Sequence, residues 1–175
     1  GTSEMLNIRT IAVLSVLALT ACAPRLAGPQ LGPDGQPIPV AYTIDQREAT
    51  EIPLRAQGQI NQLRANIGLT PLMLSPQLSA ASVAHSQDMA AQNRAWHFGS
   101  DGSSPLDRAK RQGYFGGIIG ENISESYEND VQTLNAWMQT RDTRDIIMDP
   151  TATQLGIGWY QEPSKKIWWT LVTGN

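Results

Sequence analysis

Residues 60–90, INQLRANIGLTPLMLSPQLSAASVAHSQDMA, hold the end of one predicted helix and the start of the next. Gly68 is expected to end the first helix, since glycine readily adopts the left-handed backbone that follows many helices. The pair Ser75-Pro76 opens the second helix, with serine as N-cap and proline at the first helical position. One stripe of this second helix then follows the helical repeat: Leu78, Ala81, His85 and Met89. The stretch therefore predicts two helices joined by a short loop.

Further helices are expected on both sides of this stretch. Residues 46–66 predict a first helix, with Pro53 in its first turn or breaking it there. Residues 104–113 predict a short helix that a Ser-Pro pair opens and a glycine closes. Another helix is expected to begin at 129–130, capped by the asparagine or the aspartate there.

Strands are expected only at the C-terminal end. Residues 154–160 and 166–173 predict two strands separated by a turn-forming stretch, whereas the glycine-rich residues 113–122 predict a loop. Trp168 and Trp169 are neighbours on a strand, so their side chains point to opposite faces and one is expected to be exposed. Helices beside a small antiparallel sheet predict an α+β fold.

The chain begins with a pattern typical of an export signal. Residues 1–4 read as a cloning remnant ahead of Met5. Arg9 then precedes an apolar run, residues 11–19, and a small-residue exit, which together predict a signal peptide over residues 1–21. The run is too short to span a bilayer, which needs about 20 apolar residues.

The exit from this run carries the one cysteine of the chain. Residues 19–22, Leu-Thr-Ala-Cys, resemble a bacterial lipobox, which implies cleavage before Cys22 and its lipidation with acyl chains such as palmitate. More than one chain is enough for stable membrane anchoring. Ala23 is not the aspartate associated with inner-membrane retention, so an outer-membrane anchor facing the periplasm or the cell surface is expected. The alternative is a free thiol after an ordinary cleavage site.

The residues after the cysteine differ in composition from the rest. Five prolines and three glycines fall between residues 23 and 44. Because proline favours extended backbone and removes donors, residues 22–44 predict a semi-rigid tether. The folded domain is expected over residues 45–175.

Composition and charge exclude several classes of function. The chain has 175 residues and a net charge of -3, with no basic block, which argues against nucleic-acid binding. One cysteine excludes an internal disulfide framework, and two histidines leave few candidates for acid–base or metal chemistry. Nothing resembles a coiled coil or a dimer surface, so a monomer is expected.

Several short motifs follow one another from about Ile60 to the C-terminus. They are Asn61, Arg64, Gly68-Leu69, Pro71-Leu72, Ala84 to Ala90, His97, Gly99 to Gly102, Ser104-Pro105, Asp107-Arg108, Gly113-Tyr114, Gly120 to Ile123, Ala136 to Met138 and Leu155 to Gly158. Together they resemble the CAP superfamily of cysteine-rich secretory, antigen 5 and pathogenesis-related proteins, in its short bacterial form. The resemblance implies a three-layer α-β-α sandwich with a shallow central cleft.

The resemblance also implies a cleft with two histidines and two glutamates that in several members binds zinc or another divalent ion. His97 matches the first histidine and Glu121 matches one glutamate. Thr143 stands where the second histidine is expected, and Thr140 falls near the position of the second glutamate. Half of the expected set is therefore missing, and His97, Glu121 and Thr143 remain as the candidate cleft residues.

A zinc site needs three or four nitrogen, sulfur or carboxylate ligands. His97 and Glu121 supply two, and the candidates for a third are Asp142, Asp145 and Glu125. We expect His97 and Glu121 to form a hydrogen-bonded pair without metal, and no other cofactor is indicated.

His85, on the apolar stripe, is expected to be a core histidine satisfied by one hydrogen bond. His-Glu-x-x-His and Gly-x-Ser-x-Gly are both absent from the sequence, so neither motif supports a hydrolase.

Two functions remain open. The chain is either a membrane-anchored, non-catalytic binding module for a lipid or a cell-envelope partner, or a metal-assisted hydrolase. The hydrolase would use His97 as ligand or base and Glu121 as general base. The missing second histidine favours the binding module, so an enzyme is the less expected outcome.

Overall fold

The computed structural model describes residues 31–37 and 41–175. The predicted signal segment, Cys22 and the first part of the predicted tether lie outside the described residues. Within the described part of the chain, no helix combines the length and apolar character needed to cross a membrane.

The chain divides into two units, residues 1–39 and 40–175. In the first unit, the described residues form a tight turn that an isolated antiparallel bridge between Leu31 and Pro37 closes. The backbone is therefore turned, not extended, over this short piece of the predicted tether.

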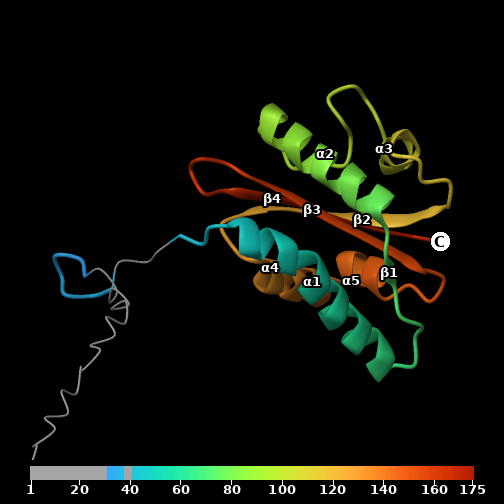
Figure 1. The fold of residues 1–175 in the computed structure, drawn as a ribbon, viewed down its shortest axis with the longest axis horizontal. Helices are drawn as coiled ribbons and strands as arrows, with labels where there is room; N and C mark the ends of the chain where they lie inside the picture. The colour runs from blue at the N-terminus through green and yellow to red at the C-terminus, as the bar shows by residue number, and fades with distance from the viewer. Residues whose placement is uncertain (1–30, 38–40) are drawn as a thin grey trace, which may run out of the picture. The chain divides into compact units, whose positions relative to one another are not determined.

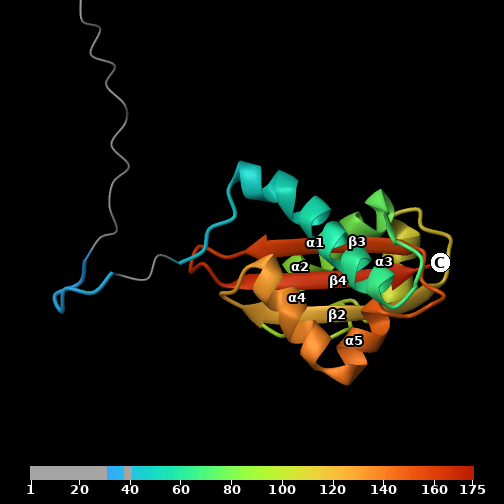
Figure 2. The same cartoon turned by 90° about the horizontal axis from the view of Figure 1, so that it is seen from below.

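In the second unit, a four-stranded sheet lies between two layers of helices (Figure 1). Helices α2 and α3 cover one face of the sheet, and α1, α4 and α5 cover the other, as the turned view in Figure 2 also shows. The predicted α-β-α sandwich is confirmed. The elements are α1 (Gln46–Asn66), β1 (Met73–Leu74), α2 (Pro76–Gln92), α3 (Pro105–Arg111), β2 (Ile118–Ser126), α4 (Asp130–Gln139), α5 (Arg141–Ile147), β3 (Gln154–Gln161) and β4 (Ile167–Gly174).

The sheet has the strand order β1-β3-β4-β2. The predicted hairpin of β3 and β4 is present, and β2 pairs antiparallel with β4. β1 pairs with β3 in parallel, so the sheet is mixed and not purely antiparallel as expected. The expectation of a loop over residues 113–122 was wrong in its second half, because β2 begins at Ile118. Gly120 belongs to this strand, and a Cβ there would lie 2.5 Å from Ile146 of α5.

Side-chain caps set most helix ends where the sequence predicts them. Ser75 accepts a hydrogen bond from the backbone of Leu78, and Asn129 caps α4 with a reciprocal bond to Gln132. Gly68 has the positive φ of +76° expected of a residue that ends a helix.

Two features of the helices differ from expectation. Pro53 lies well inside α1, neither in the first turn nor at a break. It removes one backbone hydrogen bond, and the helix continues because Ile52 and Ala56 on either side of it are buried. The separate helix α5 was not predicted. Its N-cap, Thr140, makes no side-chain capping bond, so the sequence carries no signal for its start.

The main core lies between the sheet and the α1, α4 and α5 layer. Its fully buried members include Ile52, Ile60, Ile147, Leu155, Ile167, Trp169 and Leu171. Trp168 and Trp169 are both 0% exposed, so the expectation that one of them is exposed was wrong. Their side chains do point to opposite faces, but helices cover both faces of the sheet.

On the other face, α2 packs directly against β3. A Cβ on Gly156 would lie 2.3 Å from the backbone carbon of Leu78, and one on Gly158 would lie 2.3 Å from the backbone nitrogen of Val83. Only glycine allows this close approach. It fixes the position of α2, which carries one of the site residues.

Arg64 near the end of α1 is fully buried. Its guanidinium donates hydrogen bonds to four carbonyl oxygens: those of Thr70, Ile147, Asp149 and Ala152. It thereby ties the end of α1 to the end of α5. At the other end of α1, Tyr42 and Ile44 pack against the main core, so packing begins slightly before residue 45.

Candidate functional site

Four polar side chains meet on the α2 and α3 side of the sheet, and we name them the His/Glu cluster. His85 comes from α2, Arg108 from α3 and Glu121 from β2, while His97 lies in the loop after α2. Strands and helices thus supply three members, and an exposed loop supplies the fourth.

Glu121 is the centre of the His/Glu cluster, with its side chain only 2% exposed. Its Oε2 accepts a hydrogen bond from Arg108 Nη2 at 2.7 Å. Its Oε1 lies 3.0 Å from His97 Nδ1 and 3.6 Å from His85 Nε2. The predicted pairing of His97 with Glu121 is therefore present, and each carboxylate oxygen has its own partner.

The backbone on both sides of the His97 Cα is also held by buried side chains. His85 Nε2 donates to the carbonyl oxygen of Trp96 at 2.8 Å, and Arg108 Nη2 donates to that of His97 at 3.0 Å. Arg108 Nη1 donates to the Ser103 carbonyl at 2.8 Å, which fixes the following loop. Three members of the cluster thus act together to fix the position of the fourth.

His97 itself is accessible, with 54% of its side chain exposed. A carboxylate only accepts hydrogen bonds, so Nδ1 carries the hydrogen that Glu121 receives. In the neutral imidazole Nε2 is then the acceptor nitrogen, and it makes no hydrogen bond to the described residues. The chain neighbours of His97 are both aromatic: Phe98 is 53% exposed and packs edge-on to Trp96, with ring centroids 5.7 Å apart.

His85 is 0% exposed, and the prediction of a core histidine with one hydrogen bond is confirmed. Burial lowers the pKa of His85, and the nearby Glu121 charge opposes that shift only in part. The neutral ring donates through Nε2, and its Nδ1 is buried with no hydrogen-bond partner among the described residues. The sequence did not indicate that His85 belongs with His97 and Glu121.

Thr143 lies apart from this cluster. Its hydroxyl donates within its own segment, to the carbonyl oxygen of Trp137 at 2.6 Å. Its carbonyl accepts from Asn122, the residue after Glu121. Since successive strand residues point to opposite faces, Asn122 faces α5 whereas Glu121 faces α2 and α3. The expected grouping of Thr143 with His97 and Glu121 is therefore not observed.

The candidates for a third metal ligand also lie elsewhere. Glu125 pairs with Lys166 at 3.0 Å, and Asp145 pairs with Arg141 at 3.5 Å, while Asp142 makes no contact with the His/Glu cluster. In the described residues, no three His, Cys, Asp or Glu side chains are placed to hold a metal ion. Both carboxylate oxygens of Glu121 already have hydrogen-bond partners, so His97 and Glu121 in this arrangement do not fit as ligands of a divalent ion.

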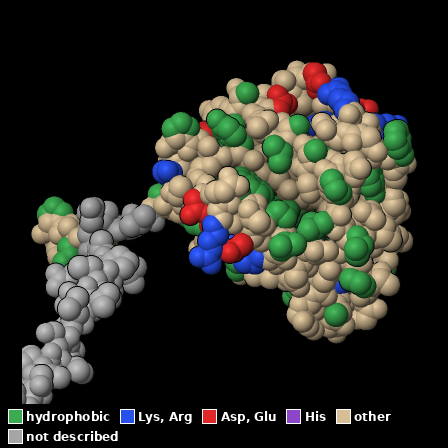
Figure 3. All heavy atoms as spheres, in the orientation of Figure 1, with side chains coloured by type: hydrophobic (Ala, Val, Ile, Leu, Met, Phe, Trp, Pro, Cys, Tyr) green, Lys and Arg blue, Asp and Glu red, His purple; other side chains and the backbone are tan. Residues whose placement is uncertain are grey.

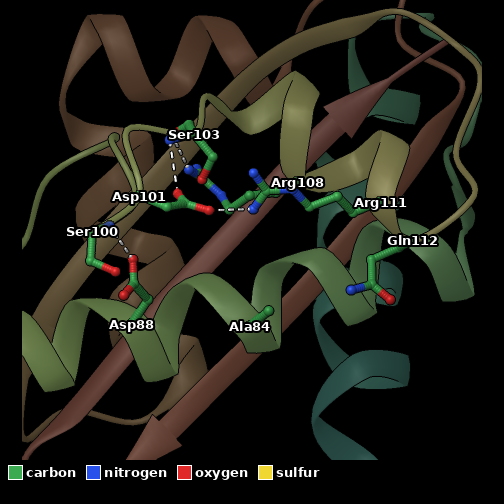
Figure 4. A pocket seen from close by; sticks show the side chains of 8 residues that line it. All are labelled: Ala84, Asp88, Ser100, Asp101, Ser103, Arg108, Arg111 and Gln112. Atoms are coloured by element: carbon green, nitrogen blue, oxygen red, sulfur yellow. Dashed lines mark hydrogen bonds and ion pairs between the residues drawn. The ribbon is translucent and has the colours of Figure 1, made fainter.

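A cavity of about 260 Å³ lies between α2 and α3 and shares Arg108 with the His/Glu cluster. Figure 4 shows Asp88 on α2 facing the loop that carries Ser100, and Asp101 bridging from that loop to Arg111. Of the charged lining residues, Asp101 and Arg111 pair with each other, whereas Arg108 pairs with Glu121 and Asp88 accepts from the backbone of Ser100.

Arg108, like His85, was not predicted as a site residue. In the sequence it stands out only as part of the Asp107-Arg108 motif of the family resemblance. Its position in the Ser104-Pro105-x-Asp107-Arg108 motif could have indicated its role. Ser104 and Asp107 form the capping box that fixes where α3 begins, and Arg108 then lies on the buried side of the helix. Arg108 is only 6% exposed.

The chain is thus an α-β-α domain whose edge strand β2 presents the glutamate of a Gly-Glu-Asn motif to a loop histidine. The model of the cysteine-rich secretory protein (CAP) family matches residues 57–173. The chain belongs to this family.

One sequence relative is the uncharacterized protein YkwD of Bacillus subtilis (strain 168). It is 33% identical over 108 residues, which is 62% of this chain and 41% of that protein. This chain therefore aligns with less than half of the relative's length.

Solved structures share the fold at low sequence identity. An extracellular protein containing an SCP domain from Bacillus anthracis str. Ames has a TM-score of 0.64 at 22% identity, covering 77% of this chain and 45% of that one. An outer surface protein of Borrelia burgdorferi has a TM-score of 0.62 at 15% identity, covering 78% of this chain and 98% of that one. These likenesses support the fold alone.

Proposed function

We propose that this chain is an exported, lipid-anchored CAP domain that acts as a non-catalytic binding module for a lipid or a cell-envelope partner. The export signal and the lipobox-like Cys22 in the sequence support the location. Two structural relatives, one an extracellular protein and one an outer surface protein, agree with it.

The observation that carries the proposal is that a half-exposed imidazole is held in one orientation by buried groups. Glu121 fixes the His97 ring, while His85 and Arg108 fix the adjacent carbonyl groups. Ordering an exposed side chain costs conformational entropy, and a preorganised contact group lowers that cost on binding. Phe98 next to it adds an accessible apolar ring.

The wider surface offers no large competing patch on the face drawn in Figure 3. Hydrophobic side chains there are spread among polar ones, and positive and negative side chains lie near one another.

The potential metal ligands in the His/Glu cluster argue against a metal-assisted hydrolase. A metal-assisted mechanism needs a metal held by several protein ligands, and the two oxygens of Glu121 are engaged by Arg108 and His97. Thr143 stands in the place of a second histidine, and its hydroxyl donates to the backbone carbonyl of Trp137.

A photo-crosslinking side chain placed at Phe98 in living cells tests the proposal. We expect a crosslinked envelope component that is lost when His97→Ala is added. The matched control is the same probe at Tyr127, which is 58% exposed and lies beyond the far end of β2. Equal products from both positions, or products that persist in His97→Ala, would contradict the proposal.

A further inference from the structure

We infer that Arg108 is the positioning residue of the site. Its guanidinium is the permanent counter-cation of Glu121, it prevents a divalent cation from binding there, and it keeps His97 in the tautomer whose Nε2 accepts hydrogen bonds. The inference rests on the proposed function, which it deepens by naming the chemistry that a partner presents to His97.

The first step concerns charge. Glu121 and Arg108 have side chains only 2% and 7% exposed, and their closest atoms are 2.7 Å apart. A buried carboxylate needs a nearby cation or several hydrogen-bond donors to stay ionised. Arg108 supplies the cation together with one hydrogen bond, and a guanidinium does not lose its proton in proteins.

The second step concerns competition for the carboxylate. A divalent cation at Glu121 would have to approach an oxygen that already accepts from Arg108 or from His97. It would also bring two more positive charges next to a buried guanidinium. The like-charge repulsion in a site of low dielectric opposes that binding.

The third step concerns the imidazole. Arg108 occupies Oε2 of Glu121 and leaves Oε1 for the Nδ1–H of His97. The same guanidinium holds the backbone carbonyl of His97 at 3.0 Å, which fixes the main chain from which the ring projects toward Glu121. Nε2 is thereby left as an acceptor, and the group that meets it is a hydrogen-bond donor such as a hydroxyl, an amide or an ammonium.

The two histidines of the chain provide an internal comparison. His85 donates from Nε2 to Trp96, so it carries the opposite tautomer to His97. Only two histidines are present, so both can be assigned without ambiguity.

The test is long-range ¹H–¹⁵N NMR of the imidazole nitrogens in the full chain carrying Cys22→Ser, at neutral pH, with and without equimolar zinc. We expect Nδ1–H at His97 and Nε2–H at His85, with neither altered by zinc. In Arg108→Met we expect zinc to shift the His97 signals, and in Arg108→Lys, which keeps the charge, we expect the wild-type spectrum.

Two results would overturn the inference: Nε2–H at His97 in the wild type, or a zinc response in the wild type as large as in Arg108→Met. If Arg108→Met does not fold, Arg108→Gln, which removes the charge but keeps hydrogen-bond donors, takes its place, and a His97 zinc response no larger than that of the wild type would contradict the inference. The measurement needs neither the lipid anchor nor a partner. A failure of the proposed function is seen in the crosslinking experiment and leaves this result unchanged.

Discussion

Arg108 and Glu121 form a buried ion pair, 2.7 Å from Nη2 to Oε2, that joins α3 to the edge strand β2. The pair belongs to the second, smaller side of the sandwich, where few apolar side chains are buried. It therefore contributes to the structure of this side as well as to the orientation of His97.

Glu121→Gln is expected to destabilise the domain by about 3 kcal/mol, because it leaves Arg108 buried beside an uncharged side chain. The change is measured as the free energy of unfolding in urea at neutral pH. The matched control is Glu125→Gln on the same strand, whose salt bridge with Lys166 is partly exposed. The control is expected to cost less than about 1 kcal/mol. Equal losses in the two variants would contradict the importance of the buried pair.

The pKa of His85 predicts a pH dependence of stability. Burial lowers the pKa of His85 in the folded state, so the unfolded chain takes up a proton first as the pH falls. Stability is therefore complete above the ordinary histidine pKa of about 6.5 and declines as the pH falls below it.

The measurement is urea unfolding between pH 7.5 and pH 5 for the wild type and for His85→Gln, whose amide can still donate to the Trp96 carbonyl. We expect the decline to be smaller in His85→Gln. His97→Gln serves as control for the other histidine. A decline of the same size in His85→Gln and in the wild type would show that His85 is not its source.

Replacing glycine by alanine is expected to change the stability of the domain in opposite directions at two positions. Gly156→Ala places a Cβ against the Leu78 backbone and is expected to destabilise by about 1–3 kcal/mol, since a helix must move away from the sheet. Gly58→Ala, in α1 with open space around it, is expected to stabilise by about 0.5–1 kcal/mol. Thermal unfolding of both variants measures these stability changes, and destabilisation by Gly58→Ala would contradict the prediction.

Cys22→Ser is expected to move the protein from the membrane pellet to the soluble fraction of a cell lysate. The reason is that acyl chains on Cys22 are proposed to anchor the protein in the membrane. The described residues contain no helix that could span it. Ala23→Ser keeps the cysteine and is expected to stay in the pellet. A Cys22→Ser protein that still pellets with membranes would make the lipobox interpretation wrong.

Local signals in the sequence predicted the positions of most elements. Ser75, Asn129 and Gly68 each act within a few residues, so their roles can be deduced without knowing the fold. Element α5 has no such signal, because Thr140 ends one helix and begins the next without a side-chain cap. The sequence of β2 predicts a loop because it contains Gly120. Glycine is needed there because the side chain of Ile146, which is distant in the sequence, occupies the place of a Cβ.

The site was predictable to a lesser degree. His97 and Glu121 follow from the family resemblance, and they are paired as expected. Arg108 and His85 join them only through the packing of α3 and α2 on the sheet, which no local pattern specifies. Thr143 matches by position in the sequence, yet strand alternation directs its neighbour Asn122, not Glu121, toward it.

The central claim is that His97 and Glu121 form a fixed contact site that needs no metal. Isothermal titration calorimetry of the Cys22→Ser chain with zinc, with His97→Ala as control, tests it most directly. We predict no binding heat that depends on His97 and no rise in the unfolding temperature with zinc. Micromolar or tighter binding that is lost in His97→Ala would contradict the claim and make the metal-assisted hydrolase the function to assay.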